Sequence, residues 1–271
     1  MNDVVKSLLG LALLGLAACA TVPDGMPGST EKFPVERPSS EKPSLTKERT
    51  TAKIHVDLGT SYLEANNLGT ALDEARVAIA WDRNYAPGHA LLGKVFASLE
   101  QYPQAQAAFA DAISLAPGDP EVNQDYGWFL CNQGRNKEGV VRLEQAARNP
   151  YNTSPARAWT TLGLCNVQMK NDAAAETAFM RAYQINSDNL RVIYHLAEIS
   201  LRKGNLVRAR EFSSELGLKL GGSNTSASLW LSLRIERKLG NRAQEQKLAT
   251  QLAREFPASD EYQAYLQGRF E

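Results

Sequence analysis

Three cysteines, Cys19, Cys131 and Cys165, are the side chains of this sequence with the clearest capacity for covalent chemistry. Thiols form disulfides, ligate metals or act as nucleophiles, depending on their spacing and on the redox state of their surroundings. Cys131 and Cys165 are 34 residues apart and neither belongs to a Cys-x-x-Cys pattern, so they form no zinc or redox motif. If the protein is exported, the pair predicts a disulfide, with two separate buried thiols as the alternative.

Whether the protein is exported depends on the apolar run that opens the chain, from Leu8 to Ala18. This run is too short to cross a membrane, which takes roughly 20 apolar residues. It follows Lys6 and ends in small residues, a layout typical of a removable bacterial export signal. We therefore expect residues 1–18 to be a signal peptide and the rest of the chain to enter an oxidising compartment.

The end of the run, Leu16-Ala17-Ala18-Cys19, resembles the lipobox of bacterial lipoproteins. The resemblance implies that the signal is cut immediately before Cys19 and that lipid is attached to the Cys19 thiol. Ala20 stands where an aspartate would favour inner-membrane retention in enteric-type sorting, so the resemblance also favours the outer membrane. Ordinary export, with cleavage near Ala18 or Ala20 and a free thiol, is the alternative.

No set of residues predicts catalysis or metal binding. The histidines, His55, His89 and His195, lack the i, i+4 spacing of helical zinc sites. His55 and His89 are 34 residues apart, a spacing that recurs along the chain as described below, and we expect both to be partly buried and structural. Phosphate-loop and Gly-x-Ser-x-Gly motifs are also missing. The 30 basic and 30 acidic residues balance, which argues against nucleic acid as a partner. We expect no enzyme, no metal, no cofactor beyond lipid on Cys19, and no small-molecule substrate.

Residues 19–51 have the composition of a tether. Five prolines stand among serines, threonines and scattered charges: Pro23, Pro27, Pro34, Pro38 and Pro43. Such a segment buries too little apolar surface to offset the entropy of ordering it. We therefore predict a disordered or extended tether that ends at residue 51, followed by one folded domain over residues 52–271.

The domain repeats itself with a period of 34 residues. Residues 86–119 show it best: Gly93 stands in a first helical stretch, Ala105 and Phe109 in a second, and Pro117 ends the unit. Equivalent glycines recur at Gly59, Gly93, Gly127 and, after a two-residue insertion within 149–155, Gly163. The pattern resembles the tetratricopeptide repeat, a helix–turn–helix unit. It predicts an all-α, right-handed superhelix of about six repeats, with the poor sixth unit as a cap.

The concave face of such a superhelix is where a protein segment would bind. Counting the tetratricopeptide register along the first helix of each of the first four repeats gives sixteen positions, which include Lys53, Ala97, Cys131 and Val167. From these sixteen we take eight as candidate groove residues: Val56, Thr60, Leu63, Ala90, Lys94, Gln124, Trp128 and Leu164. Trp128 is the largest of them and is either a groove anchor or a packing filler. Trp159 falls at an interior position, and we expect it in the core.

The lipobox, the Pro-rich segment, six repeats and the cysteine pair together resemble the type IV pilus biogenesis and stability lipoproteins, the PilF/PilW family of pilotins. The stretches DLGTSYLEANNLGTALDEARVAIAWDRNYAPGHALLGKVFASL and DYGWFLCNQGRNKEGVVRLEQAARNPYNTSPARAWTTLGLC carry the resemblance. It implies an outer-membrane lipoprotein facing the periplasm that binds the pilus secretin subunit and promotes its localisation and multimerisation. The alternative is another envelope tetratricopeptide lipoprotein, which would serve outer-membrane protein assembly or regulate a peptidoglycan enzyme.

Overall fold

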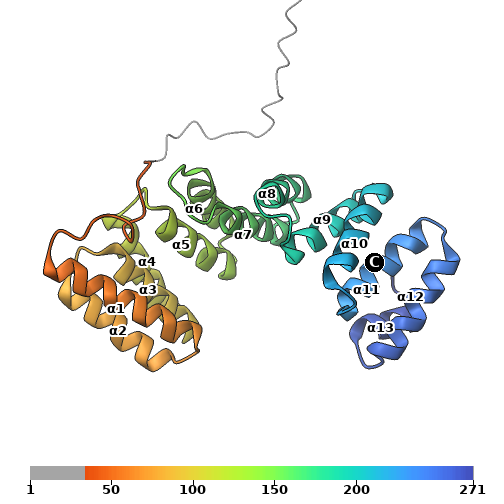
Figure 1. The fold of residues 1–271 in the computed structure, drawn as a ribbon, viewed down its shortest axis with the longest axis horizontal. Coiled ribbons are helices and arrows are strands. Elements are labelled where there is room, and N and C mark those ends of the chain that lie inside the picture. The colour runs from red at the N-terminus through yellow and green to blue at the C-terminus, as the bar shows by residue number, and fades with distance from the viewer. Residues whose placement is uncertain (1–33, 271) are drawn as a thin grey trace, which may run out of the picture. The chain divides into compact units, whose positions relative to one another are not determined.

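The computed structural model describes residues 34–270, which fold into helices joined by short turns and contain no strand (Figure 1). The helices are α1 (Lys47–Glu64), α2 (Leu68–Trp81), α3 (Ala86–Ser98), α4 (Tyr102–Leu115), α5 (Pro120–Asn132), α6 (Asn136–Arg148), α7 (Pro155–Gln168), α8 (Asp172–Ile185), α9 (Leu190–Arg202), α10 (Leu206–Leu220), α11 (Ser226–Lys238), α12 (Arg242–Glu255) and α13 (Asp260–Leu266). None of the described helices is long and apolar enough to cross a membrane. The predicted signal peptide, Cys19 and residues 20–33 of the predicted tether lie outside the described residues.

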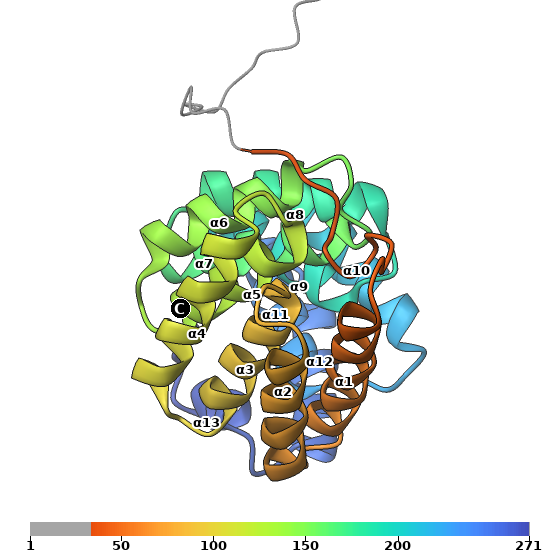
Figure 2. The same cartoon turned by 90° about the vertical axis from the view of Figure 1, so that its left-hand side faces the viewer.

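The helices pack as successive pairs, from α1 with α2 to α11 with α12. Within residues 47–255 these pairs are the repeats, numbered 1 to 6 below. The first helices of neighbouring repeats also contact one another, as α3 does with α1 and α5. The pairs therefore stack side by side along the chain, as Figures 1 and 2 show. The predicted all-α tetratricopeptide superhelix is confirmed.

Each turn between paired helices places one residue in the left-handed conformation, and three of the six turns use glycine there. Gly134, Gly204 and Gly240 have φ values of 73°, 76° and 75° at the turns of repeats 3, 5 and 6. Asparagines then cap the second helices: the Asn67 side chain accepts from Thr70 N, and Asn171, Asn205 and Asn241 do the same in their own repeats. These caps satisfy backbone N–H groups that a helix start leaves unpaired.

In repeats 2, 3 and 4, a glycine on the first helix lets a large side chain of the second helix approach. A Cβ at Gly163 would lie 2.5 Å from the ring of Phe179, and one at Gly93 would lie 2.9 Å from the ring of Phe109. Both phenylalanines are fully buried. The glycines that mark the sequence period are therefore fixed by close packing between paired helices.

The last repeat is covered by α13 and the residues after it. Trp230 of α11 stacks on Phe270, with ring centroids 5.5 Å apart, and the Arg237 guanidinium lies 3.8 Å from the Phe270 ring centroid. Leu248 and Leu252 of α12 complete this cluster. The expectation that repeat 6 itself forms the cap is wrong, because α13 and Phe270 cover it.

The start of the folded region also differs from the prediction. Helix α1 begins at Lys47, with Thr46 as its N-cap, so the predicted start at residue 52 is five residues late. Residues 34–46, called the strap below, pack against the turns before α5 and after α6. Ser39 N donates to Asp119 Oδ2 at 2.6 Å, and Asn149 Nδ2 donates to the Glu36 carbonyl oxygen at 3.0 Å.

The predicted disordered or extended tether over residues 19–51 therefore differs from the structure in its described part: residues 47–51 belong to α1, and the strap, which has no helix or strand, is packed against the domain. Composition favoured disorder there because the strap has little apolar surface to bury. The strap is held instead by polar contacts of its backbone and short side chains with distant turns, including Gly118 N, which donates to Glu36 Oε1 at 3.0 Å. Such contacts satisfy backbone groups that a Pro-rich segment cannot pair internally.

Candidate functional site

Two adjoining cavities run along the first helices of repeats 1 to 5. The larger has a volume of about 650 Å³ and extends from Leu63 of α1 to Arg191 of α9. The smaller, of about 270 Å³, lies against α1, α3 and α5 and reaches Ser40 of the strap. Six residues line both cavities: Lys94, Gln124, Asp125, Thr153, Ser154 and Arg157. The two cavities are therefore parts of one continuous surface, called the groove below.

All eight candidate groove residues taken from the sequence register line the groove. Leu63, Lys94, Gln124, Trp128 and Leu164 line the larger cavity, and Val56, Thr60 and Ala90 join Lys94 and Gln124 in the smaller one. Their spacing of three or four residues places them on one face of each first helix. Contact of these eight side chains with a partner stays a prediction.

The two tryptophans of repeats 3 and 4 occupy different environments. The Trp128 residue is 44% exposed and lines the larger cavity, so it is not a packing filler. Trp159 is half-buried and packs against the clusters around Leu162 and Ala158, as expected for a core position. A large exposed aromatic in a concave site is the kind of residue that dominates binding energy at interfaces.

An ionic cluster crosses the middle of the groove. Asp125 of α5 is 8% exposed and pairs with two cations from the neighbouring repeats. Lys94 Nζ of α3 lies 3.0 Å from Asp125 Oδ2, and Arg157 Nη2 of α7 lies 3.2 Å from Asp125 Oδ1. The pairing ties repeats 2, 3 and 4 together at the groove floor.

Glu121 occupies the strap end of the smaller cavity. Burial raises its pKa above the usual range, and the nearby carboxylates of Asp119 and Asp125 act in the same direction. The Ser40 hydroxyl opposes this shift, because it donates to Glu121 Oε2 at 2.7 Å and so favours the ionised form.

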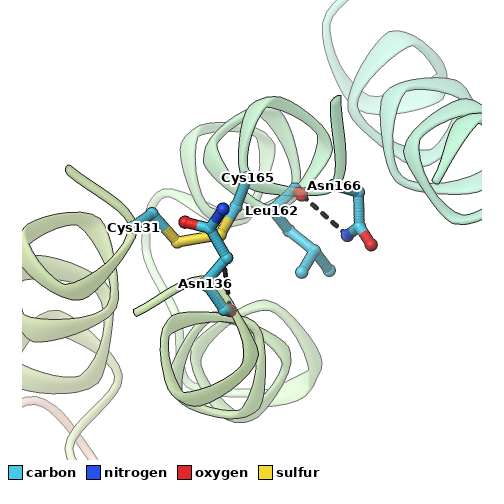
Figure 3. Close-up of a disulfide and its surroundings, with 5 residues drawn as sticks. All are labelled: Cys131, Asn136, Leu162, Cys165 and Asn166. Atoms are coloured by element: carbon cyan, nitrogen blue, oxygen red, sulfur yellow. Dashed lines mark hydrogen bonds between the residues drawn. A yellow bond between two sulfur atoms is a disulfide. The ribbon is translucent and has the colours of Figure 1, made fainter. Parts of the chain in front are cut away.

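A disulfide joins repeats 3 and 4 (Figure 3). Cys131 of α5 and Cys165 of α7 form a disulfide, with Cα atoms 5.7 Å apart, and both residues are buried. A Cβ on Gly139 of α6 would lie 2.4 Å from Cys131 Sγ. Repeat 3 therefore has glycine where repeats 2 and 4 have Ala105 and Ala175, because the sulfur occupies that space.

Comparison with known proteins agrees with this architecture. The tetratricopeptide repeat family model matches residues 156–189. Over 97% of its length the chain is 27% identical to type IV pilus assembly protein PilF of Pseudomonas aeruginosa, of which the match covers 98%. A solved structure of Pseudomonas aeruginosa PilF has a TM-score of 0.75 at 26% identity, covering 82% of this chain and 100% of that one. A crystal structure of PilW, a type IV pilus biogenesis factor, has a TM-score of 0.71 at 24% identity, covering 79% and 98%. The chain is a PilF/PilW-like tetratricopeptide-repeat protein.

The histidines of this PilF/PilW-like chain have structural partners. His55 Nδ1 lies 2.5 Å from Glu74 Oε2, and His89 Nε2 lies 2.9 Å from the Arg83 carbonyl oxygen. His195 stacks on Phe179 with centroids 5.1 Å apart. Across residues 34–270, no three His, Cys, Asp or Glu side chains are grouped so that they could hold a metal ion.

Among the groove residues of the PilF/PilW-like chain that lie outside the sequence register are Asp125, Ile185 and Arg191. Asp125 is adjacent to a candidate position, Gln124, and its partner Lys94 is itself a candidate position, so a charge opposite Lys94 was a signal that could have found it. Ile185 ends α8 and Arg191 is the second residue of α9, so both reach the groove from around the turn between repeats. The register was counted only along the first helix of each of repeats 1 to 4, so it does not include that turn.

Proposed function

We propose that this protein is a lipid-anchored outer-membrane scaffold of type IV pilus biogenesis, facing the periplasm. In this proposal it binds the pilus secretin subunit in the groove and promotes the subunit's localisation and multimerisation. The observation that carries the proposal is a continuous groove with an exposed Trp128, in a chain similar to PilF along almost its whole length.

The proposed mechanism is capture followed by concentration near the membrane. Lipid on Cys19 holds the protein at the outer membrane, and the groove holds a segment of the secretin subunit. Confinement to the membrane surface raises the effective concentration of captured subunits, so a modest affinity suffices. No cofactor beyond the covalent lipid, no nucleic acid and no small-molecule substrate takes part.

The groove is tested by Trp128→Ala in a strain that lacks the chromosomal copy. We expect binding of the purified secretin subunit to weaken about thirtyfold, the effect of a 2 kcal/mol hot spot, and secretin multimers to fall on gels. Trp81→Ala is the matched control, since Trp81 is 43% exposed on α2 and does not line the groove. Equal loss in the two variants, or normal multimers without the protein, would refute the proposal.

The anchor is tested separately by Cys19→Ser. We expect loss of labelling with a palmitate analogue and failure of secretin to reach the outer membrane, while the soluble variant still binds the subunit. Palmitate labelling that persists would refute lipidation at Cys19. If crosslinking from envelopes recovers an outer-membrane assembly subunit or a peptidoglycan enzyme in place of secretin, the alternative scaffold roles replace this one.

A further inference from the structure

We propose that the groove is electrically polarised and selects a continuous protein segment that carries an acidic side chain beside an apolar anchor. The acidic side chain lies at the α7–α9 end of the groove, and the apolar anchor lies on Trp128. This inference deepens the proposed function and rests on it, because it specifies the chemistry of the segment that the groove would hold.

The charged residues that line only the larger cavity are basic, and those that line only the smaller cavity are acidic. Arg191 lines the larger cavity and not the smaller, whereas Asp57 and Glu121 line the smaller and not the larger. Arg191 is exposed, and it forms no ion pair with another residue of the described range 34–270. The α9 end of the groove is therefore basic and the strap end is acidic.

The shared ionic cluster adds positive charge where the two cavities meet. Lys94 and Arg157 are both paired with the single carboxylate of Asp125, so one positive charge of this triad is not neutralised. The Arg157 side chain is 66% exposed, and its guanidinium carries five N–H donors in a planar fork. Arg157 therefore has donors left for a second carboxylate, beside the unpaired Arg191.

Apolar side chains lie next to this basic end. Trp128, Leu63, Leu164 and Ile185 line the larger cavity, and Ile185 is 51% exposed. Covering apolar side chains that are exposed in a concave site makes the free energy of binding more favourable. The larger cavity therefore presents an apolar wall and an excess of positive charge to the same short length of chain.

The carboxylate comes from a side chain within the segment and not from a chain terminus. The two cavities share six lining residues, so a bound segment passes from one into the other without having to end. Beyond the anchor it meets Asp57 and Glu121, which repel a second acidic residue and favour a basic or neutral one. Complementary charge then fixes both the register and the direction of the segment.

The test uses the mature full-length protein in detergent and three fluorescent synthetic peptides with the same central Leu-Phe-Leu. One peptide has glutamates on one side of this centre, one has lysines there, and one has glutamines. At low salt we expect the glutamate peptide to bind about tenfold more tightly than the glutamine peptide, measured by fluorescence anisotropy. Trp128→Ala is expected to weaken all three complexes.

Charge reversal supplies the decisive comparison. Arg157→Glu with Arg191→Glu is expected to lower the affinity for the glutamate peptide about tenfold and to reverse the preference towards lysine. Arg181→Glu, which changes an exposed arginine of α8 outside the groove, is the matched control. It should change neither the affinity for the glutamate peptide nor the preference among the three peptides. Equal affinities for the three peptides, or no binding of any of them, would overturn the inference.

The same variants separate this inference from the proposed function. If the peptides follow the charge rule and the purified secretin subunit does not bind, the inference holds and the proposed function fails. If the secretin subunit binds through Trp128 and the arginine reversal leaves that binding unchanged, the proposed function holds and the inference fails.

Discussion

The junctions on the two sides of repeat 4 are held by different chemistry. Towards repeat 3, Cys131 and Cys165 form a buried disulfide between α5 and α7 (Figure 3). Towards repeat 5, Asp172 of α8 accepts two hydrogen bonds from the Arg202 guanidinium of α9, at 2.7 and 2.9 Å. Glu176 lies beside this pair and binds Lys203 at 2.5 Å and Arg208 at 2.7 Å.

The difference shows how one repeat geometry accepts two kinds of connection. The disulfide is buried, so its strength depends on the redox state of the compartment and little on salt or pH. The ion pairs are partly exposed, so salt screens them and acid removes them. Repeat 3 makes room for its sulfur atoms with Gly139, whereas repeat 4 keeps Ala175 and the ring of Phe179.

The largest effect is expected from removing the disulfide with Cys131→Ala and Cys165→Ala together. Closing a loop of this length reduces the entropy of the unfolded chain, so we expect the free energy of unfolding to fall by roughly 3–4 kcal/mol. Urea denaturation with and without reductant measures it. Reductant should destabilise the wild type and leave the double variant unchanged; a wild type that is indifferent to reductant would contradict a structural disulfide.

A smaller effect is expected from Gly139→Ala, which tests whether the sulfur requires glycine. The added Cβ would lie 2.4 Å from Cys131 Sγ and 2.9 Å from the Gly127 carbonyl oxygen. Overpacking of this kind costs about 1–3 kcal/mol.

The control for Gly139→Ala is the same substitution made in the Cys131→Ala, Cys165→Ala double variant. There the cost should shrink, because the sulfur contact is gone, and it should not vanish, because the Gly127 oxygen remains. A double-mutant cycle over the denaturation free energies measures the coupling. An identical cost in both backgrounds would mean that the glycine serves the helix packing alone.

The repeats and the groove followed from sequence because their determinants are local. The Gly93–Phe109 contact recurs as Gly163–Phe179, and the turn asparagines cap the next helix wherever they occur. The register then selects one face of each first helix by geometry alone. All eight candidate side chains line the groove, whereas Cys131, at another position of the same register, is buried in the disulfide.

The strap did not follow from sequence because its partners are distant. Ser39 and the carboxylate that holds it, Asp119, are 80 residues apart, and no local pattern connects them. Thr46 did give a local signal, since its side chain caps α1 by accepting from Arg49 N. The prediction used only the proline, serine and threonine content of this segment, so it placed the start of the domain too late.

The smallest effect is expected at the ionic junction, from Arg202→Met. The bidentate pair with Asp172 is about one-third exposed, so we expect a loss of about 0.5–1 kcal/mol at neutral pH and low salt. Hydrogen bonds from Arg202 lower the pKa of Asp172 below its usual 3.8. The pair therefore contributes its stability above pH 3.8, and that contribution is lost as the pH falls through the lowered pKa of the folded state.

Urea denaturation of the wild type and Arg202→Met across this acid range measures the difference between them. The two stabilities should converge as Asp172 is protonated, and they should also approach each other in high salt. Lys238→Met, at an exposed position of α11, is the control and should show no such pH dependence. If the stability difference between the wild type and Arg202→Met persists in both acid and high salt, Arg202 stabilises the protein through packing of its methylene groups. The junction towards repeat 5 would then not depend on ion pairs, and the contrast with the disulfide junction would fail.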